Sequence, residues 1–324
     1  MDVPAGETLD KEVDSGEPGE PGEPGDSDDL AAPSTWAATK VVVFEHRHKI
    51  VLGALVWLWW LTFYRLGALR HDRYGTFGFD LAIFDQASWL VSQFRDPFMT
   101  VRGLDVFGHH GNFVFYLFAP FYWLGAGAKF LLAAQLASQL AGVVGIYLLA
   151  RDRIDGNRWI AVILASSMML HPTMQFLAWE FFHPESFAIG PIILAYWAGR
   201  QERWRLFWAM AILAMACKED VTFVFIMLGV LMMFRKQVRV GAWVSGVAIA
   251  WYLAVTKLII PWRNPAGPFY EEHFFSNYGG SISSVVKTII RHPSRLWRDL
   301  NEKGRTEFYL KMWAPVAFVA FMSP

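Results

Sequence analysis

The sequence predicts an all-α, polytopic membrane protein, with about eight transmembrane helices in this chain and further helices at the outer membrane surface. Three observations support this fold class. Hydrophobic residues make up 54% of the chain, which contains 16 Trp and 27 Phe. Long apolar runs recur from Ile50 onward, and a bilayer requires about 20 apolar residues in each spanning helix. Arginine-rich turns separate several of the runs, as is typical of short cytoplasmic loops.

Residues 1–47 are predicted to form a disordered cytoplasmic tail. Residues 1–35 are acidic and proline-rich, contain no aromatic residue and have Lys11 as their one basic residue, a composition typical of disorder. The tail lacks the basic segment of a cleavable signal peptide, so the first span is expected to be an uncleaved anchor. Residues 48–324 are then the polytopic membrane domain.

The arginine-rich turns fix the predicted topology, because short loops rich in Lys and Arg face the cytoplasm. They lie at Arg151–Arg158, Arg200–Arg205 and Arg235–Arg239. The last apolar run stops before it could span, so the chain is expected to be a fragment of a longer membrane protein or the product of an early-terminated gene model. The predicted crossings are about 50–69, 129–150, 159–178, 186–199, 206–216, 221–234 and 240–260, with an eighth beginning at 313.

Two long outer loops follow from this topology, at about 70–127 and 261–309. The apolar segment Asn112–Gly125 lies in the first loop and contains Pro120. Its length of about 14 residues corresponds to about 21 Å, so an interfacial or re-entrant helix is expected there in place of a crossing.

The short spans predict an outward-facing cavity. The runs 186–199, 206–216 and 221–234 are too short for a hydrocarbon core of about 30 Å, and arginines fix their inner ends. Their outer ends, which carry His183–Glu185 and Lys218–Asp220, therefore lie below the outer surface. Charges at that depth are tolerated where they line a water-filled or protein-lined cavity.

The candidate site residues form four short clusters, all at the outer face in this topology. Intramembrane ionisable groups are costly and usually mark a pathway or an active site. The clusters are Asp80 and Asp85; His109 and His110; Glu180, His183 and Glu185; and Lys218, Glu219 and Asp220.

Asp80 directly precedes an amphipathic stretch at 81–90 that is predicted to lie at the interface. One interpretation makes Asp80 the N-cap of this helix. The other makes it a catalytic general base at the mouth of the cavity, with Asp85 as a supporting carboxylate.

The paired histidines allow three interpretations. Neutral imidazole is a common metal ligand, although His109 and His110 lack the i,i+4 spacing of a helical zinc site. A hydrogen-bonding role toward a sugar or phosphate and a structural role are the alternatives. The cofactor is unknown, and a divalent metal is one candidate.

The other two clusters lie at predicted helix starts. Pro184 fits the first helical position, and Glu185 could satisfy the helix dipole. Lys218 could form a salt bridge or hold an anionic phosphate. Two acidic turns in similar places favour a shared cavity over two unrelated caps. Cys217 is the only cysteine, which excludes a disulfide within the chain.

These motifs resemble a bacterial family of predicted membrane proteins, domain of unknown function 2079, which is grouped with the GT-C superfamily. The resemblance covers about residues 50–324 and rests on the stretches 79–86, 108–110, 182–185 and 218–220. Members are usually longer at the C-terminus.

The resemblance implies an enzyme of the bacterial plasma membrane with its N-terminus in the cytoplasm. GT-C enzymes transfer a sugar from a polyprenyl-phosphate carrier at the outer face, and Asp80 occupies the place of their catalytic carboxylate. Lys218, His109 and His110, and more weakly Arg73, are candidates to stabilise the departing phosphate. The expected partners are a polyprenyl-phosphate-linked sugar and membrane lipids, and no nucleic acid. Substrate binding is expected to involve His109, His110, Glu180, His183, Glu185, Lys218, Glu219 and Asp220.

Two other functions remain open. A transporter or lipid flippase would also place charges along a path through the membrane. Against it, the arginine-rich turns leave no charged motif on the inner half of the spans, and no inverted repeat is apparent. In a non-catalytic membrane scaffold, the clusters would be salt-bridged structure.

Overall fold

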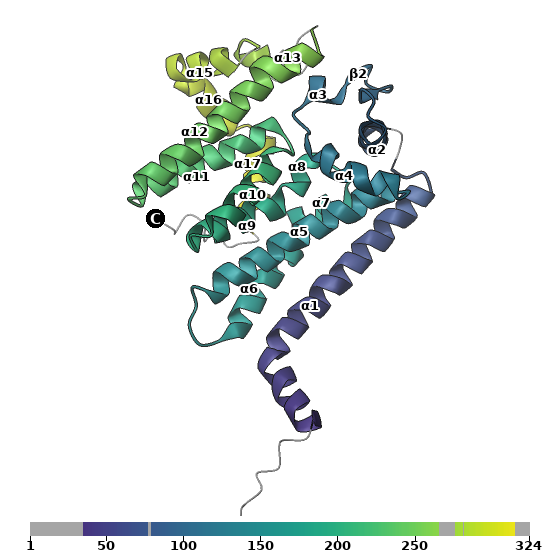
Figure 1. The fold of residues 1–324 in the computed structure, drawn as a ribbon. Helices are drawn as coiled ribbons and strands as arrows, with labels where there is room; N and C mark the ends of the chain where they lie inside the picture. Colours follow the sequence, from purple (N-terminus) through teal and green to yellow (C-terminus); the bar gives the residue numbers. More distant parts are fainter. Residues whose placement is uncertain (1–34, 77–78, 266–275, 281, 315–324) are drawn as a thin grey trace, which may run out of the picture. The chain divides into compact units, whose positions relative to one another are not determined.

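The computed structural model describes residues 35–76, 79–265, 276–280 and 282–314. The chain divides into two units, residues 1–45 and 46–324. In the described residues the secondary structure is almost entirely helical, with one two-stranded hairpin (Figure 1). The prediction of a helical chain is therefore confirmed.

The first helix begins earlier than the sequence suggests. Helix α1 spans Thr35–Asp72, so residues 35–47 are helical and do not belong to a disordered tail. Residues 1–34 lie outside the described residues. The tail predicted for them stays a prediction.

Three described helices are long and apolar enough to cross a membrane: residues His46–Asp72 of α1, helix α5 (Ala128–Arg151) and the segment Val238–Arg263. A fourth span is possible if α6 (Arg158–Leu170) and α7 (Pro172–Trp179), which meet at a bend of 52°, are counted together. The bend falls at Pro172, since proline cannot donate the backbone bond that would continue α6. All four segments coincide with predicted crossings.

The other predicted crossings coincide with shorter helices. Helices α9 and α10 have 12 residues each and α11 has 13, which corresponds to only about 18–20 Å. The run expected to begin an eighth span lies mostly at 315–324, outside the described residues. A count of eight crossings therefore stays a prediction. The bounds are α8 Pro184–Phe187, α9 Ile189–Arg200, α10 Trp204–Met215 and α11 Thr222–Phe234.

The segment between α1 and α5 folds into small elements. Helix α4 is only ten residues long, about 15 Å, which agrees with the prediction that this apolar segment does not cross the membrane. The strands pair antiparallel, with Phe98 opposite Asp105. The elements are α2 Asp80–Ser92, β1 Phe98–Met99, β2 Leu104–Asp105, α3 Val106–His109 and α4 Val114–Trp123.

The last part of the described chain is also helical. Helix α12 (Val238–Ala254) continues through a π-helical turn, η2 (Val255–Ile259), into α13 (Ile260–Arg263). The remaining elements are the 3₁₀ turn η3 Ser276–Tyr278, α15 Ile282–Arg291, α16 Pro293–Leu300 and α17 Lys303–Trp313.

The arginine-rich turns lie at the same end of the helices. Asp152, after α5, accepts hydrogen bonds from Trp197 Nε1 at 2.9 Å and from Gln201 Nε2 at 2.8 Å. A pocket joins Arg200 to Arg235 and thereby links the next two turns. The prediction that these turns share one face is confirmed, while the cytoplasmic orientation of that face stays a prediction.

Helices α11 and α12 pack closely through two glycines (Figure 1). A Cβ atom added at Gly241 would lie 2.3 Å from the carbonyl oxygen of Gly229. Close backbone approach at small residues is a common way for membrane helices to associate.

We expect Gly241→Ala to destabilise the protein by about 1–3 kcal/mol, because the added methyl group forces two backbones apart. Gly246→Ala in the same helix is the matched control, since a Cβ atom there meets nothing within 4 Å. The control should be neutral or slightly stabilising, as alanine replaces glycine inside a helix. Thermal unfolding of the purified variants in detergent measures the difference, and equal midpoints for the two variants would contradict the packing described.

Candidate functional site

Two segments far apart in sequence are joined at Glu219. His110 Nδ1 lies 2.7 Å from Glu219 Oε1, and the Gly111 amide donates to Oε2 at 2.8 Å. Next to them, Asn112 Nδ2 donates to the Cys217 carbonyl at 2.6 Å. The chain before α4 is thereby fixed to the 3₁₀ turn η1 (Glu219–Val221) between α10 and α11.

Glu219 is the most buried charged residue of the four clusters, with 5% of its surface exposed. Burial alone would raise the pKa of its carboxyl group. The hydrogen bonds from His110 and from the Gly111 amide outweigh burial and lower the pKa of Glu219 to about 2. An ionised carboxylate therefore holds the two segments together at neutral pH.

Lys218 connects a third segment to the same turn. Its Nζ lies 3.2 Å from Glu185 Oε1 and 3.7 Å from Asp220 Oδ2. Burial acts to lower the pKa of Lys218, but the carboxylates of Glu185 and Asp220 outweigh it and raise the pKa. Of the two roles predicted for Lys218, the structure contains the salt bridge.

The two carboxylates beside Lys218 differ. For Glu185, the attraction of Lys218 outweighs burial, and the pKa is lowered. For Asp220, burial together with repulsion from Glu219 and Glu185 raises the pKa despite Lys218. Asp220 is therefore the member of this group that takes up a proton more readily than an ordinary aspartate.

His109 faces a different partner from His110. Its Nε2 lies 2.8 Å from Arg102 Nη2, and a guanidinium can only donate, so this nitrogen accepts and the ring is neutral. Burial, followed by repulsion from His110 and Arg102, lowers the pKa of His109 to about 3. The guanidinium of Arg102 also lies 5.6 Å from the ring centroid of Phe79, directly before Asp80.

A metal fits these histidines poorly. His109 directs Nε2 toward a cation, and His110 directs Nδ1 toward Glu219. Within the described residues, no group of three His, Cys, Asp or Glu side chains is placed to hold a metal ion. His109 and His110 thus form hydrogen bonds to Arg102 and Glu219 of the protein itself, as in the structural interpretation of the pair, and a hydrogen-bonding role toward a sugar or phosphate stays a prediction.

The low pKa of His109 predicts a pH-dependent stability. The unfolded chain binds a proton near pH 6.5, whereas folded His109 does so only near pH 3. The contribution of this residue is complete above pH 6.5 and is lost as the pH falls toward 3, with a slope of at most about 1.4 kcal/mol per pH unit. We expect His109→Gln to lose less stability than the wild type between pH 7.5 and 5 in thermal unfolding. A variant with the wild-type pH dependence would show that His109 is not the titrating group.

His183 is held by a residue that the sequence analysis did not single out. Gln135 is buried in the predicted span α5. Its Oε1 accepts a hydrogen bond from the His183 backbone N–H at 2.9 Å, and its Nε2 donates to the Leu177 carbonyl at 2.9 Å. The ring of His183 lies edge-on to Phe84 of α2, with centroids 6.4 Å apart. A glutamine inside a membrane span is itself a signal of function or structure, and it could have identified Gln135.

Asp85 is anchored by α4. Tyr122 donates a hydrogen bond to Asp85 Oδ1 at 2.7 Å, so this carboxylate joins α2 to α4. Burial raises the pKa of Asp85, and the bond from Tyr122 partly opposes it. The supporting role predicted for Asp85 beside Asp80 stays a prediction.

Asp80 lies in the first turn of α2 and is half-buried. The residue in the N-cap position is Phe79, so the interpretation of Asp80 as an ordinary N-cap is wrong. Asp80 makes no hydrogen bond or ion pair with any described residue. Of the two acidic candidates on α2, Asp85 is hydrogen-bonded to Tyr122. The Asp80 carboxylate has no partner among the described residues.

No contact among the described side chains joins Glu180 to the other clusters. It is half-buried at the end of α7, beside a fixed carbonyl. Arg70, near the end of α1, donates to the Trp179 carbonyl at 3.0 Å and lies over the Trp179 and Phe181 rings. Arg70 was not a candidate, and a lone arginine at the end of a predicted span gives little signal in the sequence.

A separate aromatic cavity of about 640 Å³ lies between the segment that joins α1 to α5 and the end of the helix that continues from α12. Its walls include Phe107, Phe113 and Trp123, with Arg263 at its edge. Arg263 bridges Asp96 at 2.8 Å and Asp105 at 2.5 Å. No residue of the four clusters lines this cavity, so the predicted cavity floored by the clusters stays a prediction.

The helical spans and the polar network at their ends define a polytopic membrane protein. A family model described as "Predicted membrane protein (DUF2079)" matches residues 70–324, and the chain belongs to this family. No curated protein and no solved structure matches the chain.

Proposed function

We propose that the protein is a membrane glycosyltransferase that transfers a sugar from a polyprenyl-phosphate donor to an acceptor hydroxyl at the outer face. The proposal rests on the half-buried Asp80 carboxylate, which has no partner among the described residues. Phenylalanines on either side of Asp80 in the sequence contact residues that belong to, or bind, two of the other clusters. Phe79, before it, contacts Arg102 and through it His109, and Phe84 contacts His183.

In this reaction Asp80 acts as the general base. It takes the proton of the acceptor hydroxyl while the oxygen forms a bond to the anomeric carbon. The bond from that carbon to the phosphate oxygen of the carrier breaks, with inversion at the carbon, and polyprenyl phosphate leaves. The proton on Asp80 is then released to water.

The departing phosphate requires a cation. Lys218 remains protonated, although Glu185 and Asp220 compete for it. Arg102 is a second candidate, since its guanidinium reaches both the Phe79 ring and His109. One N–H group of the Arg102 guanidinium donates to His109, and its other N–H groups can donate to a phosphate.

The aromatic cavity supplies a place for the lipid part of the donor. At about 640 Å³ it lies within the range of about 300–1,000 Å³ that is usual for ligand sites. Its apolar walls suit an isoprenoid chain. Phe107 and Phe113, which line this cavity, flank the paired histidines in sequence.

Reconstitution in liposomes separates this proposal from transport. The full-length chain is incorporated with a polyprenyl-phosphate sugar, with and without a soluble acceptor on the outside. Release of polyprenyl phosphate that depends on the acceptor supports glycosyl transfer. Movement of the intact lipid-linked sugar between leaflets without any acceptor would favour a flippase and contradict the proposal.

A further inference from the structure

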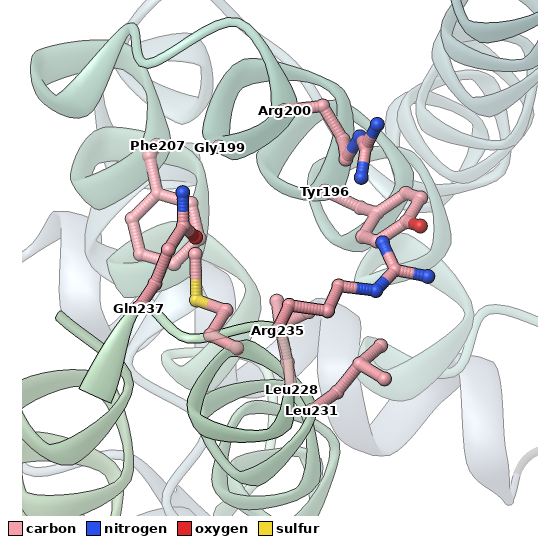
Figure 2. A pocket seen from close by; sticks show the side chains of 9 residues that line it. Tyr196, Gly199, Arg200, Phe207, Leu228, Leu231, Arg235 and Gln237 are labelled. Atoms are coloured by element: carbon pink, nitrogen blue, oxygen red, sulfur yellow. The ribbon is translucent and has the colours of Figure 1, made fainter.

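A second site lies at the opposite ends of the same helices. A pocket of about 190 Å³ lies between the turn that joins α9 to α10 and the turn that joins α11 to α12. Figure 2 shows Arg200 and Arg235 extending toward Tyr196 at one side, and Gln237 beside Phe207 at the other. Polar side chains from both turns therefore face one small space.

The two guanidinium groups carry the charge of this pocket. Arg151, Arg263, Arg298 and Arg305 form ion pairs within the described part of the chain. Arg200 and Arg235 are not among them. Two cations in one pocket repel each other, and an anion placed between them offsets this electrostatic repulsion.

Helix dipoles explain only part of the arrangement. Arg200 ends α9 and Arg235 follows α11, and cations near helix C-termini are favourable by about 0.3–1 kcal/mol. A favourable interaction with the helix dipole does not, however, require the two arginines to line a pocket. Here the arginines stand over an apolar wall that includes Phe207, Leu228 and Leu231.

We propose that this pocket binds the phosphate of an anionic phospholipid headgroup. The two guanidinium groups provide paired donors that match phosphate oxygens, and Tyr196 and Gln237 supply further hydrogen-bond donors. The pocket is smaller than the about 300 Å³ usual for drug-sized ligands, so it fits a headgroup and not a whole lipid.

The apolar wall favours a lipid over a free phosphate ion. Leu231 is 36% exposed and lies on α11, so it can contact the first methylene groups of an acyl chain. Basic pockets between transmembrane helices are known recognition sites for anionic headgroups. The site is independent of the glycosyl transfer proposed above, because it lies at the arginine-rich end.

Native mass spectrometry of the purified full-length protein tests the proposal. Phosphatidylglycerol is titrated in detergent, with phosphatidylcholine as the zwitterionic comparison and sodium phosphate as a competitor. The test variant is Arg200→Gln/Arg235→Gln. The matched control is Arg205→Gln/Arg239→Gln, which removes two arginines of the same turns that do not line the pocket. Arg235→Gln alone serves if the double variant does not fold.

We expect the wild type and the control to bind one phosphatidylglycerol more tightly than phosphatidylcholine, and the test variant to bind it at least tenfold more weakly. Equal losses in the test and control variants would overturn the proposal in favour of non-specific attraction to a basic face. Unchanged binding by the test variant would also overturn it. Displacement by millimolar sodium phosphate would assign the pocket to a soluble anion.

Discussion

Replacing Asp80 by asparagine is expected to lower glycosyl transfer by about 10²–10⁴-fold, the contribution typical of a general base. Folding should be unaffected, because Asp80 is not engaged by any described residue and the amide has nearly the same shape. Transfer is measured with the full-length protein in membranes or liposomes, with the amount of inserted protein determined in parallel.

Asp72→Asn is the control for this experiment. Asp72 is the last residue of α1, is paired with Lys129 at 2.6 Å, has 54% of its side chain exposed and does not line the aromatic cavity. This variant should transfer at the wild-type rate. Normal transfer by Asp80→Asn would refute the assignment of Asp80 as the base, whatever the control shows.

Replacing Glu219 by glutamine is expected to cost about 2–4 kcal/mol of stability, since charge-assisted hydrogen bonds contribute about 1.5–3 kcal/mol each. The glutamine side chain has one acceptor oxygen in place of two, so it cannot accept from both His110 and the Gly111 N–H as the carboxylate does. A buried donor is therefore left unsatisfied. With about 2–4 °C per kcal/mol for larger domains, thermal unfolding in detergent should occur about 4–16 °C lower.

Glu185→Gln makes the same chemical change at the edge of the network. The Glu185 side chain is 43% exposed, and exposed ion pairs contribute about 0–1 kcal/mol. Its unfolding midpoint should remain close to that of the wild type. Similar midpoints for Glu219→Gln and Glu185→Gln would contradict the central position assigned to Glu219.

Much of the helical framework could be predicted from the sequence, because apolar runs and arginine-rich turns are local signals. The long helices α1 and α5 lie where the runs predict them, and the short runs became short helices. The start of α1 at Thr35 could not be read from composition, since an acidic tail and a helix start overlap there. The strand pair at 98–105 is too short to leave a periodic pattern.

The site was predictable as a set of residues but not as a set of contacts. His110, Glu185 and Lys218–Asp220 do meet in the structure, whereas the position of all four clusters at the outer face stays a prediction. The pairing of His110 with Glu219 joins positions 109 residues apart, and only the packed chain determines it. Arg102 and Gln135 were missed for the same reason, because each acts through a partner that is distant in sequence.

The most direct test of glycosyl transfer compares the lipid-linked sugars in membranes from wild-type cells and from cells carrying full-length Asp80→Asn. We expect a polyprenyl-phosphate sugar to accumulate in the variant, because its donor is no longer consumed; this lipid would also identify the donor. An unchanged lipid profile, with the variant protein present at the normal level, would contradict glycosyl transfer through Asp80 and favour transport.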